Sequence, residues 1–94
     1  MAHWLLQYEY VPDIVTRRGP HRAAHLQAIA RQHDAGHLIL AGAHGDPPHG
    51  GTFVFVDVDR ADVEAFARDD PYAQAGLVRS SRIEPLAAVV SPVL

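Results

Sequence analysis

The sequence predicts an α+β fold with the element order β-α-β-β-α-β, and three observations support this prediction. Short runs rich in aromatic and β-branched residues occur near both ends of the chain and in its middle. Two longer segments carry apolar residues at helical spacing, one before the middle strands and one after them. A stretch dense in glycine and proline joins the two middle strands. This order is typical of a ferredoxin-like, four-stranded antiparallel sheet with two helices on one face.

The first half of the chain supplies two strands and the helix between them. Residues 3–11 mix aromatic and branched side chains in partial alternation, which indicates a strand. Residues 20–35 are expected to form a helix, because proline is tolerated in a first turn and Gly36 can end the helix. Residues 38–41 are predicted to be a short buried strand. Residues 42–51 are rich in turn formers and are predicted to be a loop.

The second half begins with a strand at residues 52–58, which completes the hairpin. Asp59 is predicted to cap a helix over residues 60–69, with Phe66 facing inward. After this helix, a short helical or turn segment follows Pro71.

The last strand is expected over residues 78–90, with an interruption near Pro85. With 94 residues, the chain is predicted to form one domain, residues 1–94, around a single modest core.

Composition excludes several classes of function. The net charge is −3 and the pI is near 6.1, which argues against nucleic acid as a partner. All eight basic residues are arginine, so lysine chemistry is excluded, and there is no cysteine for a thiol nucleophile, a disulfide or a thiolate metal site. The amino terminus does not resemble a signal peptide and the run 86–90 is too short to span a bilayer, so we expect a cytoplasmic protein without a membrane partner.

One face of the predicted sheet lacks a helical cover. Trp4, Leu6, Phe53, Phe55 and their neighbours are expected to supply apolar residues to both sides of the sheet. An uncovered apolar face predicts association, most simply a two-fold homodimer that packs sheet against sheet.

Histidine is the unusual component of this composition. Two pairs have the four-residue spacing of metal ligands on a helix, His21 with His25 and His33 with His37. No acid or third histidine completes a recognised pattern, so we predict no metal site and no cofactor. The sequence assigns no role to five histidines, which are His21, His33, His37, His44 and His49.

His25 and Asp70 are the candidate reactive residues. His25 lies about 40° from Ile29 on a helical wheel, so it should point toward the sheet. A histidine there is either a core residue with satisfied hydrogen bonds or a functional residue with an acid as partner. Asp70 is either the N-cap of the segment after Pro71 or such a partner, and the two roles are compatible.

Four segments of the chain resemble one known family. They are RAAHLQAIARQHDAGHLILAG, GGTFVFVDVD, DDPYAQAGLV and RIEPL, and they resemble the YCII-related (YciI-like) proteins of the dimeric α+β barrel superfamily. The resemblance covers nearly the whole chain. It implies a ferredoxin-like protomer, a homodimer and a cleft in which His25 and Asp70 form the active-site pair. Relatives in the superfamily include muconolactone isomerase-like enzymes and a dehydrochlorinase, which both transfer protons on small cyclic substrates.

The expected function is therefore cofactor-independent proton transfer, as isomerisation or elimination, on a small cyclic or carbonyl-containing substrate. His25 is expected to act as general acid or base, and Asp70 to orient it. Arg22 could hold a carboxylate or enolate oxygen, with Tyr72 and Trp4 lining an apolar pocket. Two alternatives remain open: a module that binds or senses a small ligand in the same cleft, and a structural dimer in which the pair is a buried tie. The sequence does not identify the substrate.

Overall fold

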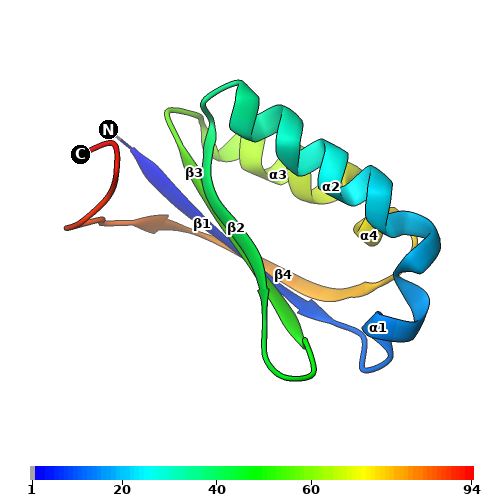
Figure 1. Ribbon diagram of the computed structural model, residues 1–94. Helices are drawn as coiled ribbons and strands as arrows, with labels where there is room; N and C mark the ends of the chain where they lie inside the picture. Colours follow the sequence, from blue (N-terminus) through cyan, green and yellow to red (C-terminus); the bar gives the residue numbers. More distant parts are fainter. Residues whose placement is uncertain (1) are drawn as a thin grey trace.

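The structure, a computed structural model, describes residues 2–94 and contains one four-stranded antiparallel sheet in the order β2-β3-β1-β4. The two long helices, α2 and α3, lie on one face of this sheet (Figure 1). The predicted ferredoxin-like α+β fold is thus confirmed, with two additional short helices. The strands are β1 His3–Tyr10, β2 Leu38–His44, β3 Gly50–Val56 and β4 Val78–Leu86, and the helices are α1 Ile14–Arg17, α2 Gly19–Asp34, α3 Arg60–Asp69 and α4 Pro71–Gln74.

The hairpin of β2 and β3 is longer than the sequence predicted. Residues 42–44 and 50–51 were expected in a loop, but they are paired strand residues, with Ala43 opposite Gly51 and His44 opposite Gly50. Gly50 and Gly51 are needed here for close packing, since a Cβ on Gly51 would lie 2.5 Å from the Tyr10 hydroxyl oxygen and one on Gly50 would lie 2.8 Å from the Tyr8 carbonyl oxygen. Glycine therefore marks a tight approach within a strand at this position.

Two further elements differ from the prediction. The last strand ends at Leu86, and Pro85 does not interrupt it, because β4 lies at the edge of the sheet, where a residue without an N–H is tolerated. Helix α1 was not predicted, since four residues are too short to show helical periodicity. Its one buried residue is Ile14, which is 1% exposed.

The predicted helix ends are confirmed. Asp59 precedes α3, and its backbone N–H donates to Asp62 Oδ2 at 2.9 Å. Phe66 faces the core as expected. Gly36 follows α2 with a φ of +79°, the left-handed conformation in which glycine commonly ends a helix.

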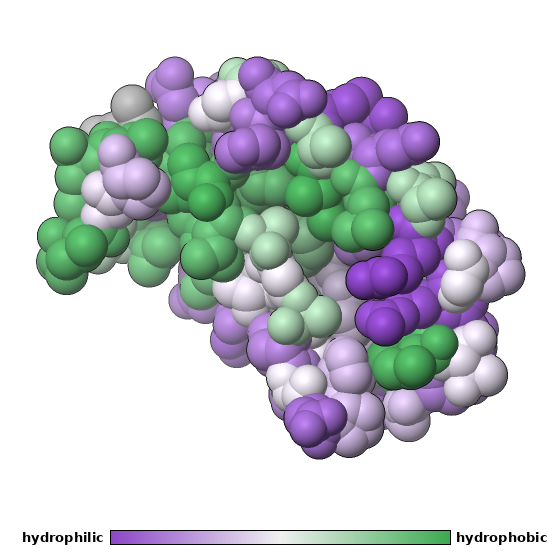
Figure 2. Space-filling model, in the orientation of Figure 1, coloured by the Kyte–Doolittle hydropathy of each residue, from purple (hydrophilic) through white to green (hydrophobic). Residues whose placement is uncertain are grey.

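The side chains named in the dimer prediction lie elsewhere than expected. Trp4 pairs with Phe55 and Leu6 with Phe53, and all four belong to or pack against the core between sheet and helices. The opposite sheet face still carries an apolar groove at one end. Figure 2 shows apolar side chains gathered at the end of the molecule where the two termini lie. The apolar residues that line the groove are Ile39, Leu40, Val54, Leu86, Ala88, Val90 and Pro92.

Within residues 2–94, none of the helices has the length and apolar character that a membrane span requires.

Candidate active site

Asp70 lies at the junction of α3 and α4. The adjacent acid, Asp69, has a very different environment. Asp70 Oδ1 accepts a hydrogen bond from the Tyr72 backbone N–H at 3.0 Å, and Pro71 occupies the first helical position. This confirms the predicted N-cap. The neighbouring Asp69 points outward and forms an exposed ion pair with Arg68 at 3.1 Å. The helix junction therefore turns one of two adjacent carboxylates into the protein.

Three donors converge on the Asp70 carboxylate, which is only 1% exposed. Besides the Tyr72 N–H, His25 Nδ1 lies 2.7 Å from Oδ1, and the Tyr8 hydroxyl donates to Oδ2 at 2.8 Å. The donors come from α4, α2 and β1, so three separate elements fix the position of this carboxylate. A buried carboxylate needs such partners, because desolvation without them is costly.

His25 projects from α2 toward the sheet, as its place on the helix predicted, and it is 5% exposed. Because a carboxylate oxygen only accepts hydrogen bonds, Nδ1 carries the proton in the bond to Asp70. In neutral imidazole the lone pair is then on Nε2. The Tyr72 ring stacks on the imidazole, with centroids 3.7 Å apart and planes 6° apart. Hydrogen bond and stacking together fix both the tautomer and the ring orientation.

Tyr8 is a member of this network that the sequence did not reveal. Burial raises the pKa of its hydroxyl far above the ordinary value, and the charge of Asp70 adds to the effect. Tyr8 therefore remains a protonated donor to Asp70 at physiological pH. The alternation along β1 could have placed Tyr8 on the covered face, but only the strand order brings it beneath the junction of α3 and α4.

A cavity of about 220 Å³ opens beside His25, between the start of α2 and the hairpin strands. Its polar lining consists of His25, Arg18, Arg22, Tyr10 and Tyr72. The apolar wall is formed by side chains of α2 and the two hairpin strands, which are Leu26, Ile29, Ala41, Ala43 and Phe53. Of the predicted pocket residues, Arg22 and Tyr72 are in place, and the positive charge of Arg22 opposes the rise that burial causes in the pKa of the Tyr72 hydroxyl.

Trp4 is not part of this cavity, which corrects the prediction. Its Nε1–H donates to the Val58 carbonyl oxygen at 3.1 Å, and the Arg60 guanidinium lies 5.9 Å from the ring centroid. Trp4 shares a sheet face with Tyr10, but Tyr10 is six positions further along the strand, a distance of roughly 20 Å. A shared face therefore did not mean a shared pocket.

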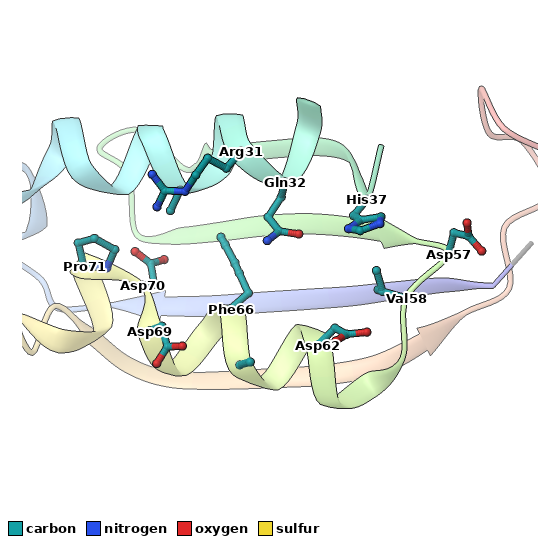
Figure 3. Close-up of a pocket in the computed structure, with 12 residues that line it drawn as sticks. Arg31, Gln32, His37, Asp57, Val58, Asp62, Phe66, Asp69, Asp70 and Pro71 are labelled. Atoms are coloured by element: carbon teal, nitrogen blue, oxygen red, sulfur yellow. The ribbon is translucent and has the colours of Figure 1, made fainter. Parts of the chain in front are cut away.

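A second cavity, of about 470 Å³, lies on the other side of the pair, between α2 and α3 (Figure 3). Asp70 and Pro71 lie at one end of it and Asp57 at the other, with Arg31 projecting from α2. This cavity is larger, but His25 does not line it. The free nitrogen of His25 thus belongs to the smaller cavity.

The remaining histidines do not form a metal site in the part of the chain that the structure describes. No group of three or more His, Asp or Glu side chains between residues 2 and 94 is arranged to hold a metal ion. His33 Nδ1 donates to the Leu38 carbonyl oxygen at 3.1 Å. His44 and His49 lie near the hairpin turn with ring centroids 5.2 Å apart.

Comparison with known proteins gives one family match and several structural neighbours. A family model described as the YCII-related domain matches residues 1–87. No curated protein sequence matches the chain.

A 5-chloro-2-hydroxyhydroquinone dehydrochlorinase from Burkholderia phenoliruptrix AC1100, solved in complex with 2,5-dihydroxybenzoquinone, has a TM-score of 0.73 and 20% identity, over 87% of this chain and 90% of that chain. An antibiotic biosynthesis monooxygenase-like protein from Nitrosomonas europaea has a TM-score of 0.54 and 13% identity, over 96% and 100% of the two chains. A nipsnap family protein of unknown function from Agrobacterium tumefaciens has a TM-score of 0.57 and 15% identity, over 100% and 94%. At these identities the structures show a shared fold.

Proposed function

The chain belongs to the YCII-related family, and on this basis we propose that it is a cofactor-independent enzyme in which His25 transfers a proton on a small substrate. One observation carries the proposal. His25 Nδ1 is bound to the buried Asp70 at 2.7 Å, while the ring lines a cavity large enough for a small molecule. This is the arrangement that a general base needs, since one nitrogen is held by a carboxylate and the other is left for the substrate.

In the proposed reaction, His25 Nε2 removes a proton from a carbon next to a carbonyl group. The electron pair of the broken C–H bond moves to the carbonyl oxygen and gives an enolate. Asp70 stabilises the imidazolium, and Arg22 stabilises the enolate oxygen. The imidazolium then returns its proton to a different carbon, which completes an isomerisation. Alternatively, the enolate expels a leaving group and the imidazolium releases its proton to solvent, which completes an elimination.

The structural neighbour from Burkholderia phenoliruptrix supports this class of reaction, because it is a dehydrochlorinase of a chlorinated hydroxyhydroquinone. Dehydrochlorination of this kind removes a proton and a chloride from a small ring. We therefore propose a small cyclic or carbonyl-containing compound as the substrate of this chain as well. A module that only binds such a compound is the second candidate, because the same cavity serves both functions.

Deuterium exchange separates the two candidates before the substrate is known. We expect the protein to exchange the acidic C–H of at least one compound in a panel of small lactones, keto acids and halogenated phenols in D2O, as followed by proton NMR. His25→Gln should slow this exchange by about 10²- to 10⁴-fold, the usual contribution of a positioned base.

The matched control is His21→Gln, the same substitution one turn earlier on α2. This variant should catalyse deuterium exchange of the compound at the wild-type rate. Deuterium exchange at the wild-type rate by His25→Gln would disprove the assignment of His25 as the base. Binding of a panel compound by NMR without any exchange in the wild-type protein would favour the binding module.

The proposed function includes a homodimer formed through the uncovered sheet face. The apolar groove on this face supports it, because Leu40 is 55% exposed there and Val90 is 90% exposed. We expect Leu40→Glu to convert a dimer into a monomer, since a buried charge without a partner is costly. Sedimentation at micromolar concentration measures the mass, with Val15→Glu on α1 as the exposed control. A monomeric wild-type protein would contradict the dimer.

A further inference from the structure

Two arginines of this chain have no carboxylate partner and face the cavity of His25. Five of the eight arginines form ion pairs with an acid on the surface, namely Arg17, Arg60, Arg68, Arg79 and Arg82. Within residues 2–94, Arg18 and Arg22 form no such pair. The lining of the cavity contains no aspartate or glutamate. In a protein of net charge −3, this cavity therefore has an uncompensated positive charge.

The two arginines also occupy positions that helix stability disfavours. Arg18 is the N-cap of the 16-residue helix α2, and Arg22 lies at its first turn. That end of a helix carries partial positive charge and favours acids. Helix α2 has neither an acid in its first turn nor a side chain that caps its free N–H groups. The stability of α2 does not explain why two cations are placed there, and Arg18 is favourably placed only with respect to the four-residue helix α1, whose C-cap it also is.

The floor of the cavity offers a polar group to a ligand. His25 is 95% buried, and its Nδ1 is occupied by Asp70. The only hydrogen bond of its ring within the described chain is that one, so Nε2 faces the cavity without a protein partner. Among the described residues, no side-chain nitrogen or oxygen is both buried and without a partner, so Nε2 is accessible from the cavity and available to a bound group. Arg18, Arg22 and Nε2 thus face one space.

We propose that Arg18 and Arg22 form a binding site for the carboxylate of a small organic acid. Guanidinium groups recognise carboxylates through paired, charge-assisted hydrogen bonds. The apolar wall of Leu26, Ile29 and Phe53 receives the body of the acid and directs it toward His25. The volume of about 220 Å³ is below the range for drug-sized ligands and admits a compound of about one ring.

This inference deepens the proposed function, and it rests on that function only for the claim that the acid is the substrate of His25. The carboxylate binds to the arginines and leaves Nε2 free for the acidic C–H. The site therefore selects acids over neutral analogues of the same shape. Arg18 joins Arg22 as a residue that determines specificity.

Benzoate and benzamide provide the direct test, because they have nearly the same shape and differ in charge. We expect benzoate to bind the full-length protein in isothermal titration calorimetry and benzamide to bind at least about 10-fold more weakly. Arg18→Gln and Arg22→Gln should each weaken benzoate binding by about 10- to 100-fold. The control Arg31→Gln removes an arginine of the same helix that faces the other cavity, and it should bind benzoate as the wild-type protein does.

Thermal unfolding establishes that each variant is folded, and if Arg18→Gln does not fold, Arg22→Gln decides the question. Equal affinity for benzoate and benzamide, no benzoate binding at millimolar concentration, or unchanged binding in the folded arginine variants would overturn the inference. His25→Gln is expected to retain benzoate binding within about threefold, since the arginines hold the carboxylate. Arginine-dependent binding without deuterium exchange would uphold the carboxylate site and reject the proposed proton transfer. Deuterium exchange by the wild-type protein, together with benzoate binding that the arginine substitutions leave unchanged, would reject the carboxylate site and uphold the proposed proton transfer.

Discussion

Replacement of Asp70 by asparagine is expected to lower the free energy of unfolding by about 2–4 kcal/mol. Three donors point at the buried carboxylate, from Tyr8, His25 and the Tyr72 backbone. An asparagine side chain has the same shape, but its NH2 group must face at least one of these donors. A buried donor is then left without an acceptor, which is the costly outcome of such a substitution.

Asp69→Asn is the matched control, because it makes the same chemical change at the adjacent residue. Asp69 is exposed and paired only with Arg68, so its replacement should change the free energy of unfolding by less than about 0.5 kcal/mol. Urea denaturation at pH 7 measures both variants. Equal midpoints for the two variants would contradict the role of Asp70 as the acceptor of three buried bonds.

The same variant should also lose proton-transfer activity. The amide favours a changed tautomer or a rotated ring of His25, and Nε2 then no longer faces the cavity as a base. We expect a decrease in deuterium exchange of about 10²- to 10⁴-fold, similar to that of His25→Gln. A stability loss with unchanged exchange would mean that the pair is a structural tie.

The positions of His25 and Asp70 could be predicted because local rules determine both. Helical periodicity directs His25 toward the sheet, and the Asp-Pro pair indicates an N-cap at residue 70. The contact itself depends on how α2 packs beside the junction of α3 and α4, which the fold class suggests but does not measure. The distance of 2.7 Å between His25 Nδ1 and Asp70 Oδ1 results from this packing, which no local rule determines.

Residues on strands were harder to place than residues on helices. Alternation assigns Trp4 and Tyr8 to one face of β1, yet Tyr8 binds Asp70 while Trp4 packs near Val58 at the far end of the strand. Which of the two side chains reaches the site depends on strand order and register. The sequence of one strand alone determines neither the order nor the register. Arg18 was missed for a related reason, because a four-residue helix that the sequence did not predict positions it at the start of α2.

Stability is expected to fall steeply above about pH 10 because the tyrosines of the core cannot ionise without unfolding. Burial is the main cause that raises the pKa of Tyr8, Tyr10 and Tyr72, and for Tyr8 the charge of Asp70 adds to it. In the unfolded chain these hydroxyls titrate near pH 10. The unfolded state therefore loses protons first, and each further pH unit favours it. The chain contains neither lysine nor cysteine, so no side chain of those types titrates in this range.

Tyr8→Phe isolates the contribution of one hydroxyl. At pH 7 the variant should be less stable than the wild-type protein, because the buried oxygen of Asp70 loses a donor. Above pH 10 the difference should shrink by about 1.4 kcal/mol per pH unit, since phenylalanine removes the cost of keeping that hydroxyl protonated. Phe66→Leu changes the core without changing a titrating group, so its free energy of unfolding should stay parallel to wild type from pH 8.5 to about 11.5. If Tyr8→Phe also stays parallel, Tyr8 ionises in the folded protein, and its hydroxyl is not the fixed donor that holds Asp70 in place.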